Sequence, residues 1–340
     1  MIQHAIARLL DGRDLELAEA KEAMHEIMSG EATPAQTAGF LVALSAKGET
    51  VDEIAGCAEA MRAHVVPVVP AREDLVDTAG TGGDGARTLN ISTAAALVAA
   101  AAGAAVAKHG NRAVSSASGS ADVLEALGFD LALEPERIAQ SIDELGFGFI
   151  FAPAHHPGFR HAAPVRKELG VRTVFNVLGP LTNPAGARAQ VVGVYSPELA
   201  PVIADVLSRL GARRAFVVHG AAGIDELSPA GPNLVYEVAD GSVHSRTIDP
   251  SELGVERCAP EALRGGTPAE NAAAIRAVFA GETGAHRDAV LLNAAGAIAA
   301  AGHAHDLAEG LALARDAVDS GASAERLESL VAFTRAEVAH

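Results

Sequence analysis

The chain has 340 residues, 49% hydrophobic and 20% charged, a composition typical of a folded globular protein and not of a disordered chain. Its formal net charge of −17 at pH 7 disfavours non-specific binding to nucleic acid or to an anionic membrane. The two cysteines, Cys57 and Cys258, lie far apart and predict a reduced, cytoplasmic protein. The charged N-terminal residues do not form a signal region, and the longest apolar run, residues 97–107, is too short to span a bilayer.

Residues 1–64 predict a small unit of three helices without a strand. A first helix is expected to end at Gly30, because glycine commonly terminates helices. Thr33, directly before a proline, marks the start of a second helix. Thr50 and Glu53 have the spacing of a capping box at the start of a third.

From residue 75 onward, short apolar segments alternate with helical segments. This alternation predicts the α/β class, with a largely parallel sheet that helices cover on both faces and a mostly helical C-terminal third. The expected strands are residues 75–77, 104–110, 147–153, 190–196, 215–220 and 233–238, and the first expected helices between them are residues 93–103 and 121–128.

Two stretches fit neither pattern. Residues 65–74 contain too many prolines for a helix and are expected to be a linker. Residues 152–184 are basic in an otherwise acidic chain, which favours an excursion out of the sheet rather than another strand–helix unit. The basic side chains of this stretch are Arg160, Arg166, Lys167 and Arg172.

Residues 80–93, "GTGGDGARTLNIST", contain the G-x-G-x-x-G pattern of dinucleotide-binding loops. That interpretation fails, because the helix does not begin at the third glycine and is expected to start with a cap at Ser92 or Thr93. Lys108 stands where an acidic residue would hold a ribose, and Asp84 inside the loop would repel a pyrophosphate. The P-loop pattern G-x-x-x-x-G-K-[ST] does not occur in the sequence.

The remaining features predict a longer anion-binding loop, in which glycine N–H groups and hydroxyl groups at a helix N-terminus surround oxygen atoms. The next strand supplies Lys108 and Asn111, and residues 115–120, "SSASGS", form a second small-residue loop before a helix. Two such loops favour an extended ligand with two phosphate groups. The alternative is that each loop is only a turn and a helix cap. That alternative is weaker here, because two such loops occur together with a lysine between them.

Several long motifs follow one another along the chain: "GTGGD", "NIST", "KHGNRAVSSASGSADVLEALG", "PVRKELGVRTVFNVLGPLTNP" and "GIDELSP". In these motifs and their spacing the chain resembles the anthranilate phosphoribosyltransferases, over essentially its whole length. The resemblance implies transfer of the phosphoribosyl group of 5-phosphoribosyl-1-pyrophosphate to the amine of anthranilate, in tryptophan biosynthesis, with Mg²⁺ required.

The resemblance also implies a domain organisation. A helical domain, residues 1–70 with an excursion near residues 165–185, would carry dimerisation and the anthranilate side. An α/β domain shared with nucleoside phosphorylases, residues 71–164 and 186–340, would bind phosphoribosyl pyrophosphate. The expected partners are the two substrates, a second copy of the chain and an anthranilate synthase, with no nucleic acid and no membrane.

The resemblance places phosphoribosyl pyrophosphate at the two small-residue loops. For Ser92 the alternative is a plain helix cap, and one serine can serve as both. The implied residues are Gly80, Gly82, Gly83, Asp84, Thr88, Asn90, Ser92, Thr93, Lys108, Asn111, Ser115, Ser116 and Ser120.

For Mg²⁺ the resemblance implies Ser92, Asp225 and Glu226. Mg²⁺ prefers hard oxygen ligands and usually takes one or two carboxylates beside substrate phosphate. Acidic pairs are common in surface loops, so the metal-binding role of this pair is assigned from the resemblance and not from the pair alone. Related proteins often carry an acidic residue near Ala222, and this chain does not.

On the anthranilate side, Arg166 is expected to bind the carboxylate, because a guanidinium binds carboxylate with two parallel hydrogen bonds. The alternative, a surface arginine at a helix start, suits Lys167 better. The full implied set is Gly80, His109, Asn111, Arg166 and Gly179.

His155, His156 and His161 invite a metal-site interpretation. No carboxylate accompanies them at ligand spacing, and an enzyme that uses a hard cation does not need imidazole ligands. We therefore favour packing or a substrate channel for them.

Two rival functions remain at this stage. A pyrimidine nucleoside phosphorylase would share the fold and the glycine loop, but has no reason to carry "KHGNRAVSS" or "VRKELGVRTVFNVLGPLTNP". A related nucleic-acid-binding protein should be basic and should lack the site residues, whereas this chain is acidic and keeps them.

Overall fold

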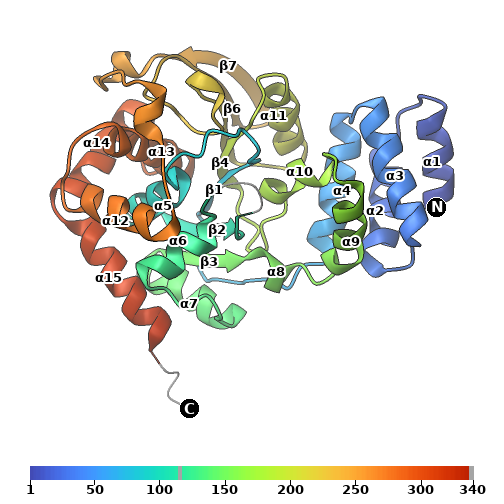
Figure 1. Ribbon diagram of the computed structural model, residues 1–340, viewed down its shortest axis with the longest axis horizontal. Coiled ribbons are helices and arrows are strands. Elements are labelled where there is room, and N and C mark those ends of the chain that lie inside the picture. The colour runs from blue at the N-terminus through green and yellow to red at the C-terminus, as the bar shows by residue number, and fades with distance from the viewer. Residues whose placement is uncertain (114–116, 337–340) are drawn as a thin grey trace.

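The computed structural model describes residues 1–113 and 117–336, with a helical end and a larger end built around a sheet (Figure 1). The helical end begins with α1 (Ile2–Leu10), α2 (Leu17–Ser29), α3 (Pro34–Lys47) and α4 (Val51–Ala63). The prediction of three helices was wrong by one, because it missed α1. Ile2, Ala5 and Leu9 of α1 are buried along one face, a stripe too short to stand out in the sequence.

The predicted end signals fix where these helices begin and stop. Gly30 follows α2 with a φ of 80°, which glycine adopts without strain. The Thr33 hydroxyl accepts the Gln36 N–H at 3.2 Å, and the Thr50 hydroxyl accepts the Glu53 N–H at 3.3 Å. Local sequence therefore sets the first residues of α3 and α4.

The larger end contains a seven-stranded sheet. Its strands are β1 (Leu75–Gly80), β2 (Ala105–Gly110), β3 (Phe147–Phe151), β4 (Ala189–Gly193), β5 (Arg214–His219), β6 (Asn233–Ala239) and β7 (Ser242–Ile248). Their order is β3-β2-β1-β4-β5-β6-β7; β6 runs antiparallel to both β5 and β7, and the other neighbours are parallel. The predicted α/β class with a mainly parallel sheet is confirmed.

Helices cover both faces of this sheet, as expected. One face packs Val76, Val106 and Val191 against the helices α5 (Ile91–Ala101), α6 (Ser120–Leu127), α12 (Pro268–Phe279), α13 (Ala285–Ala301), α14 (Leu307–Asp319) and α15 (Ala322–Arg335). The opposite face packs against α7 (Pro135–Leu145) and α11 (Leu199–Arg209). Short helices η2 (Ala221–Gly223), η3 (Pro250–Leu253) and η4 (Pro260–Leu263) complete this end.

The sequence prediction missed β7, which pairs with β6 at the edge of the sheet. Its residues, "SVHSRTI", are mostly exposed and lack the apolar alternation that marks a half-buried strand. Asp240 and Gly241, with φ values of 50° and 75°, form the tight turn between the two strands. This Asp-Gly pair was the available signal for a hairpin.

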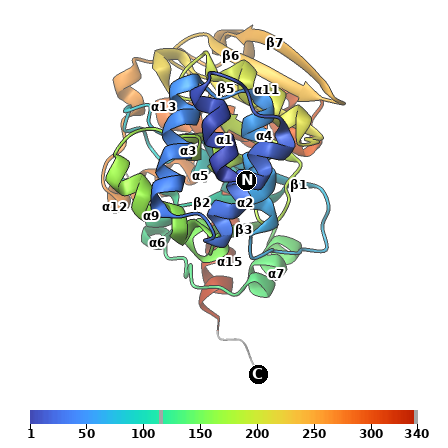
Figure 2. The ribbon, with the colours of Figure 1, turned by 90° about the vertical axis from the view of Figure 1, so that its right-hand side faces the viewer.

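The basic stretch leaves the sheet domain and forms helices of its own. These are α8 (Ala152–His155), α9 (Phe159–Leu169), α10 (Phe175–Leu178) and η1 (Gly179–Leu181). Ala162, Val174 and Leu178 share a buried apolar cluster with side chains of α1 to α4. In the second view, α9 stands beside α2 and α3 in front of the sheet (Figure 2). The excursion thus packs with the helical end, while the exact domain division stays a prediction.

The chain crosses between the two ends at neighbouring places. The Val66 N–H donates to the His155 carbonyl oxygen at 2.8 Å, and the His155 Nδ1 lies 2.9 Å from the Val66 carbonyl oxygen. The Val68 N–H donates to the Pro184 carbonyl oxygen at 3.2 Å. The predicted linker therefore lies against both ends of the excursion. Among the described residues, no helix is long and apolar enough to cross a membrane.

Glu53 is the buried charge on which the helical end depends, so we predict that Glu53→Ala lowers the unfolding free energy by about 3 kcal/mol. Its side chain is 0% exposed and accepts the Leu15 N–H at 2.9 Å, the Thr50 N–H at 2.8 Å and the Lys47 ammonium at 3.0 Å. Removing it leaves the N–H groups of Leu15 and Thr50 without an acceptor, while Lys47 keeps only Asp14 and the Gly48 carbonyl oxygen. Urea denaturation measures the loss.

The control is Asp52→Asn, one residue away, whose pair with Arg209 is about half exposed. It should cost less than about 1 kcal/mol. Equal losses in the two variants would contradict the role of Glu53.

Candidate active site

Asp225 and Glu226 lie in the loop after β5, and this loop crosses the carboxyl ends of β1 and β4. Gly80 and Gly193 end these strands and are paired in register. A β-carbon at either glycine would overlap Asp225, at its carboxylate in the first case and its carbonyl in the second. The two glycines therefore make room for the acidic loop. Sequence reasoning named Gly80 but missed Gly193, which carried only the signal of a glycine at a strand end.

The predicted glycine loop folds against the same carboxylate. Gly82 and Gly83 have φ values of 65° and 79°, and the Gly82 N–H donates to Asp225 Oδ2 at 2.7 Å. The Asp84 carboxylate accepts the Ala86 N–H at 3.1 Å and the Asp225 N–H at 3.4 Å. The loop and the acidic pair thus form one structure, although they are far apart in the sequence.

Helix α5 begins at Ile91 with Asn90 as its N-cap, so the predicted cap at Ser92 or Thr93 was wrong and lies too late in the chain. Asn90 serves the loops instead: its Nδ2 donates to the Ser118 carbonyl oxygen at 3.0 Å and its Oδ1 accepts Asn271 Nδ2 at 2.8 Å. An asparagine at the N-cap leaves the two hydroxyl residues inside the first turn of α5.

In that first turn, the Ser92 N–H donates to Glu226 Oε1 at 3.1 Å. The Thr93 hydroxyl is buried and has no hydrogen-bond partner within the described part of the chain. Thr88 lies farther back, in an isolated bridge with Arg264, directly after η4. A helix N-terminus with free donors beside a carboxylate suits an anion held together with a cation.

Lys108 is a fully buried lysine on β2, between the two predicted loops. Its ammonium donates to the Thr78 carbonyl oxygen at 2.5 Å and to the Thr78 hydroxyl at 3.2 Å, and lies 3.5 Å from Ser92 Oγ. Burial lowers the pKa of Lys108, while Asp77 and Glu226 oppose that shift. The two acidic side chains thus favour the charged ammonium against the effect of burial.

Too little positive charge lies near Asp225 and Glu226 to balance two ionised carboxylates. Burial, followed by repulsion from Asp84, raises the pKa of Asp225 to about 7, and burial with repulsion from Asp225 raises that of Glu226 to about 8. A divalent cation would relieve this repulsion. Within residues 1–113 and 117–336, no three His, Cys, Asp or Glu side chains form a complete metal site. This donor set suits Mg²⁺ completed by ligand oxygens, rather than a metal held by protein alone.

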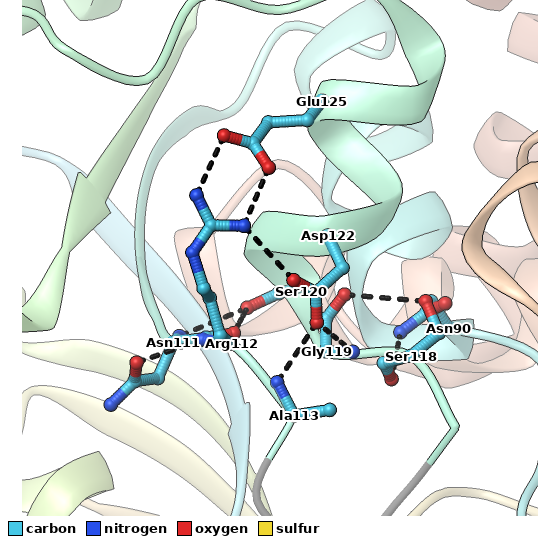
Figure 3. Close-up of polar contacts among 9 residues, drawn as sticks. All are labelled: Asn90, Asn111, Arg112, Ala113, Ser118, Gly119, Ser120, Asp122 and Glu125. Atoms are coloured by element: carbon cyan, nitrogen blue, oxygen red, sulfur yellow. Dashed lines mark hydrogen bonds and ion pairs between the residues drawn. The ribbon is translucent and has the colours of Figure 1, made fainter.

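The second loop is anchored to the first turn of α6, as Figure 3 shows. The Ser120 hydroxyl accepts the Asn111 N–H and donates to the Asn111 carbonyl oxygen, each at 3.2 Å. Asp122 Oδ2 accepts the N–H groups of Ala113 and Gly119, each at 2.9 Å. Arg112 pairs with Glu125 and Asp122 (Figure 3). Two predicted residues, Ser115 and Ser116, lie outside the described residues.

His109 and His156 form a buried pair with an assignable proton arrangement. His109 Nδ1 lies 3.2 Å from the Gly179 carbonyl oxygen, so it carries the proton and leaves Nε2 as an acceptor. His156 Nε2, at 3.1 Å, must then donate to that nitrogen. His156 Nδ1 is left as a buried acceptor without a partner in the described part of the chain. An added donor, such as a ligand N–H, would satisfy it.

Arg166 lies on α9, half-buried between two aromatic rings. Its guanidinium carbon is 5.2 Å from the ring centre of Phe159 and 5.1 Å from that of Phe175. Burial lowers the pKa of Arg166 from its ordinary value, though a guanidinium stays charged at neutral pH. Phe175 begins α10, the helix that leads to Gly179, so Arg166 and Gly179 belong to one side of the site.

The three histidines of the basic stretch have separate positions. His155 binds Val66 at the linker, and His156 pairs with His109. His161 receives a hydrogen bond from Arg160 at 3.2 Å and lies close to Gly30 after α2. Each histidine thus has a different partner, and packing or a substrate channel stays our prediction for the three.

Sequence reasoning also missed Asp77 and Asn183, whose side chains form hydrogen bonds with the backbone of β2. Asp77 Oδ1 accepts the His109 N–H at 3.1 Å, and Asp77 Oδ2 accepts Asn183 Nδ2 at 2.8 Å. Both side chains are buried, and burial raises the pKa of Asp77 to about 6. A single aspartate within a strand carries no motif, so only the three-dimensional structure identifies it.

Because of the packing at the strand ends, we predict that Gly193→Ala lowers the unfolding free energy by about 2–4 kcal/mol. The added methyl group would overlap the backbone of Asp225, so the acidic loop would have to shift. Thermal and urea denaturation measure the effect.

Gly39→Ala is the matched control. Its added methyl group would meet only Ile6, at 3.4 Å, an ordinary contact inside the helical end. Unchanged stability of Gly193→Ala would mean that the acidic loop is not packed as described.

The histidine pair predicts an acid-dependent loss of stability. Burial, and then repulsion from neighbouring histidines, lowers the pKa of His109 to about 3 and that of His156 to about 4, from 6.5. The unfolded chain therefore binds protons that the folded chain does not bind below about pH 6.5. The stabilising contribution is complete above that pH and declines as the pH falls towards about 4.

The double variant His109→Gln/His156→Gln should flatten the dependence of unfolding free energy on pH in this window. His244→Gln, at an exposed position on β7, should leave the slope unchanged. A slope that persists in the double variant would assign the acid sensitivity to other groups.

Comparisons with known proteins give the family. A glycosyl transferase family model for a helical bundle domain matches residues 3–65, and one for an a/b domain matches residues 72–324. Anthranilate phosphoribosyltransferase from Anaeromyxobacter dehalogenans strain 2CP-C is 55% identical over 334 residues, which cover 98% of this chain and 99% of the relative.

Solved structures agree along the whole chain. The crystal structure of anthranilate phosphoribosyltransferase from Thermus thermophilus has a TM-score of 0.93 at 54% identity, covering 98% of this chain and 99% of that one. The Saccharomyces cerevisiae protein in complex with PRPP and Mg has a TM-score of 0.88 at 30% identity, covering 98% and 97%. The chain therefore belongs to the anthranilate phosphoribosyltransferases of the glycosyl transferase family.

Proposed function

We propose that the protein transfers the phosphoribosyl group of 5-phosphoribosyl-1-pyrophosphate to the amine of anthranilate, giving N-(5-phosphoribosyl)anthranilate and diphosphate, in tryptophan biosynthesis. The observation that carries this proposal is the buried Lys108 between a glycine loop and a serine loop, with Asp225 and Glu226 at the same sheet edge. This arrangement combines anion donors with a partial cation site, which a diphosphate–magnesium ligand requires.

Phosphoribosyl pyrophosphate would lie along the carboxyl ends of β1 and β2. The glycine loop and the first turn of α5 offer N–H and hydroxyl donors, including the Thr93 hydroxyl, which has no partner in the described part of the chain. Lys108 supplies the fixed positive charge between the loops. Asn111 and Ser120 would hold the far end of the ligand, at the start of α6.

Mg²⁺ would be held by Asp225 and Glu226, with Ser92 nearby. The raised pKa values of the two carboxyls support this, because they reflect buried negative charge without enough compensation. When bound, Mg²⁺ neutralises the charge that builds on diphosphate as the bond to the ribose carbon stretches. Lys108 supports the same charge from the protein side.

Anthranilate would approach from the side of the excursion. Its amine is neutral and weakly nucleophilic at neutral pH, so positioning and leaving-group stabilisation must supply most of the rate. The His156 Nδ1, unpaired among the described residues, is an acceptor suited to an amine N–H. The low pKa values of His109 and His156 fit a role as hydrogen-bond acceptors rather than as proton stores.

Arg166 would bind the anthranilate carboxylate, held in place by the two phenylalanine rings. Gly179 would border the aromatic ring, since a β-carbon there would meet nothing within 4 Å and the space beside it is open. Arg166 and Gly179 come from the excursion, whereas Lys108 and Asp225 come from the sheet. Closure of the two ends, with residues 65–70 as one hinge, would bring the substrates together.

The helical end would form a homodimer. Leu10 and Val42, on α1 and α3, are 74% and 45% exposed, and such an interface would cover these apolar side chains. An anthranilate synthase remains the expected partner that supplies the substrate. Free Cys57 and Cys258 fit the cytoplasm.

The test of this function is direct. The purified protein is mixed with Mg²⁺, phosphoribosyl pyrophosphate and anthranilate, and the fluorescence of anthranilate is followed. We expect it to decay only when all three are present. Constant fluorescence at every Mg²⁺ concentration would refute the proposal.

Within this function, Arg166→Ala should raise the KM for anthranilate at least about tenfold and leave that for phosphoribosyl pyrophosphate within about twofold. Loss of a charge-assisted, two-point contact accounts for such a change. Lys167→Ala, the exposed neighbour on α9, is the control and should match the wild type. Equal effects of Arg166→Ala on both KM values would remove its assigned role.

A further inference from the structure

Arg172 joins the excursion to the glycine loop. Its Nη2 donates to the Gly83 carbonyl oxygen at 2.8 Å, while its guanidinium carbon lies 4.0 Å from the centre of the Tyr195 ring. Arg172 follows α9, Gly83 follows β1 and Tyr195 follows β4, so three distant segments meet here. A planar guanidinium can stack on a ring and donate from its edge at once, which a lysine ammonium does not do.

Both ends of this contact are fastened. The Tyr195 N–H donates to Thr81 Oγ1 at 3.2 Å, and the Thr81 N–H donates to the Gly193 carbonyl oxygen at 2.9 Å. The backbone that carries the Tyr195 ring is therefore bonded to Thr81, at the start of the glycine loop. On the other side, the Arg172 carbonyl oxygen accepts the Ser45 hydroxyl of α3 at 3.4 Å. A chain of contacts thus runs from the helical end to the glycine loop.

The contact sets the direction of one peptide group. The peptide between Gly83 and Asp84 is trans, so its carbonyl and its N–H point in opposite directions. With the carbonyl held towards Arg172, the Asp84 N–H faces away from it. Neither the Gly83 N–H nor the Asp84 N–H has a hydrogen-bond acceptor among the described residues. Both remain available to a ligand oxygen.

A glycine loop needs such an external constraint. Gly82 and Gly83 reach positive φ without strain, and the same freedom lets their peptides rotate in the absence of a partner. A rotated peptide would point its carbonyl oxygen at the anion and repel it. Asp225 fixes the Gly82 N–H, and Arg172 fixes the Gly83 carbonyl group.

We propose that Arg172, stacked on Tyr195, is a positioning residue that orients the glycine loop for phosphoribosyl pyrophosphate. It acts through the Gly83 peptide and not by its charge on the substrate. The role rests on the proposed function, because it names the ligand of that site. It also links the segment that carries Arg166 and Gly179 to the loop at the opposite side.

The experiment measures the Kd of phosphoribosyl pyrophosphate with Mg²⁺, by titration calorimetry, together with both KM values and kcat. Arg172→Met should weaken binding about tenfold and leave the KM for anthranilate within about twofold. Tyr195→Ala should produce most of the same loss, and Tyr195→Phe, which keeps the ring, should restore binding. Lys167→Met, in the same basic segment, is the control.

The double variant Arg172→Met/Tyr195→Ala separates positioning from other roles. If the two side chains act as one unit, it binds no more weakly than Arg172→Met alone. Full binding by Arg172→Lys with no effect of Tyr195→Ala would show a simple charge effect and overturn the proposal. If Arg172→Met proves thermally unstable, the comparison of Tyr195→Ala with Tyr195→Phe decides whether the proposal holds.

Failure of this inference is distinguishable from failure of the proposed function. If the wild type consumes no anthranilate, the function is wrong. If the wild type is active and Arg172→Met binds phosphoribosyl pyrophosphate like Lys167→Met, only the role of Arg172 is wrong.

Discussion

Asp225 occupies the space that side chains at Gly80 and Gly193 would require, and this close packing fixes the site. The loop after β5 lies across the ends of β1 and β4 because both strands end in glycine at the same register. Asn293 of α13 holds the other side of the loop, accepting the Leu227 N–H at 2.9 Å and donating to its carbonyl oxygen at 2.8 Å. Protein contacts on both sides therefore hold the loop that carries the carboxylate.

This placement brings buried acidic groups together, which makes the electrostatics of the site unfavourable. Asp225 and Glu226 are buried together, and Lys108 supplies buried positive charge between Glu226 and Asp77. Repulsion in a buried group of carboxylates costs stability, and the raised pKa values express that cost. A ligand that brings both a divalent cation and phosphate oxygens would balance these charges. These charges therefore suit a ligand–metal pair better than either component alone.

The sequence was most informative where conformation depends on neighbouring residues. The capping residues predicted the starts of α3 and α4, and alternation of segments predicted the mainly parallel sheet. Two expectations were wrong for physical reasons. Helix α5 begins after Asn90, whose side chain bonds Ser118 and Asn271 instead of the helix, and β7 was missed because it is a polar edge strand. Competition from tertiary contacts overrides local preference in the first case.

The site itself was predictable only in part. Long motifs led to the glycine loop, Lys108 and the acidic pair, but Gly193 is needed because a distant carbonyl approaches it, and His156 matters because its partner is on β2. No pattern within a short window contains such information.

The contacts of Asn183 fasten the return of the excursion to the sheet. Asn183 donates to Asp77 and to the Ala107 carbonyl oxygen, each at 2.8 Å, and is buried at the return of the excursion. It therefore moves with the sheet. Pro180 of η1 is joined to the sheet as well, because its carbonyl oxygen accepts the Gln190 side-chain amide of β4 at 2.6 Å. Because the Gly179 carbonyl oxygen also lies 3.2 Å from His109 Nδ1 of β2, the end of the excursion is held against the strand that carries Lys108.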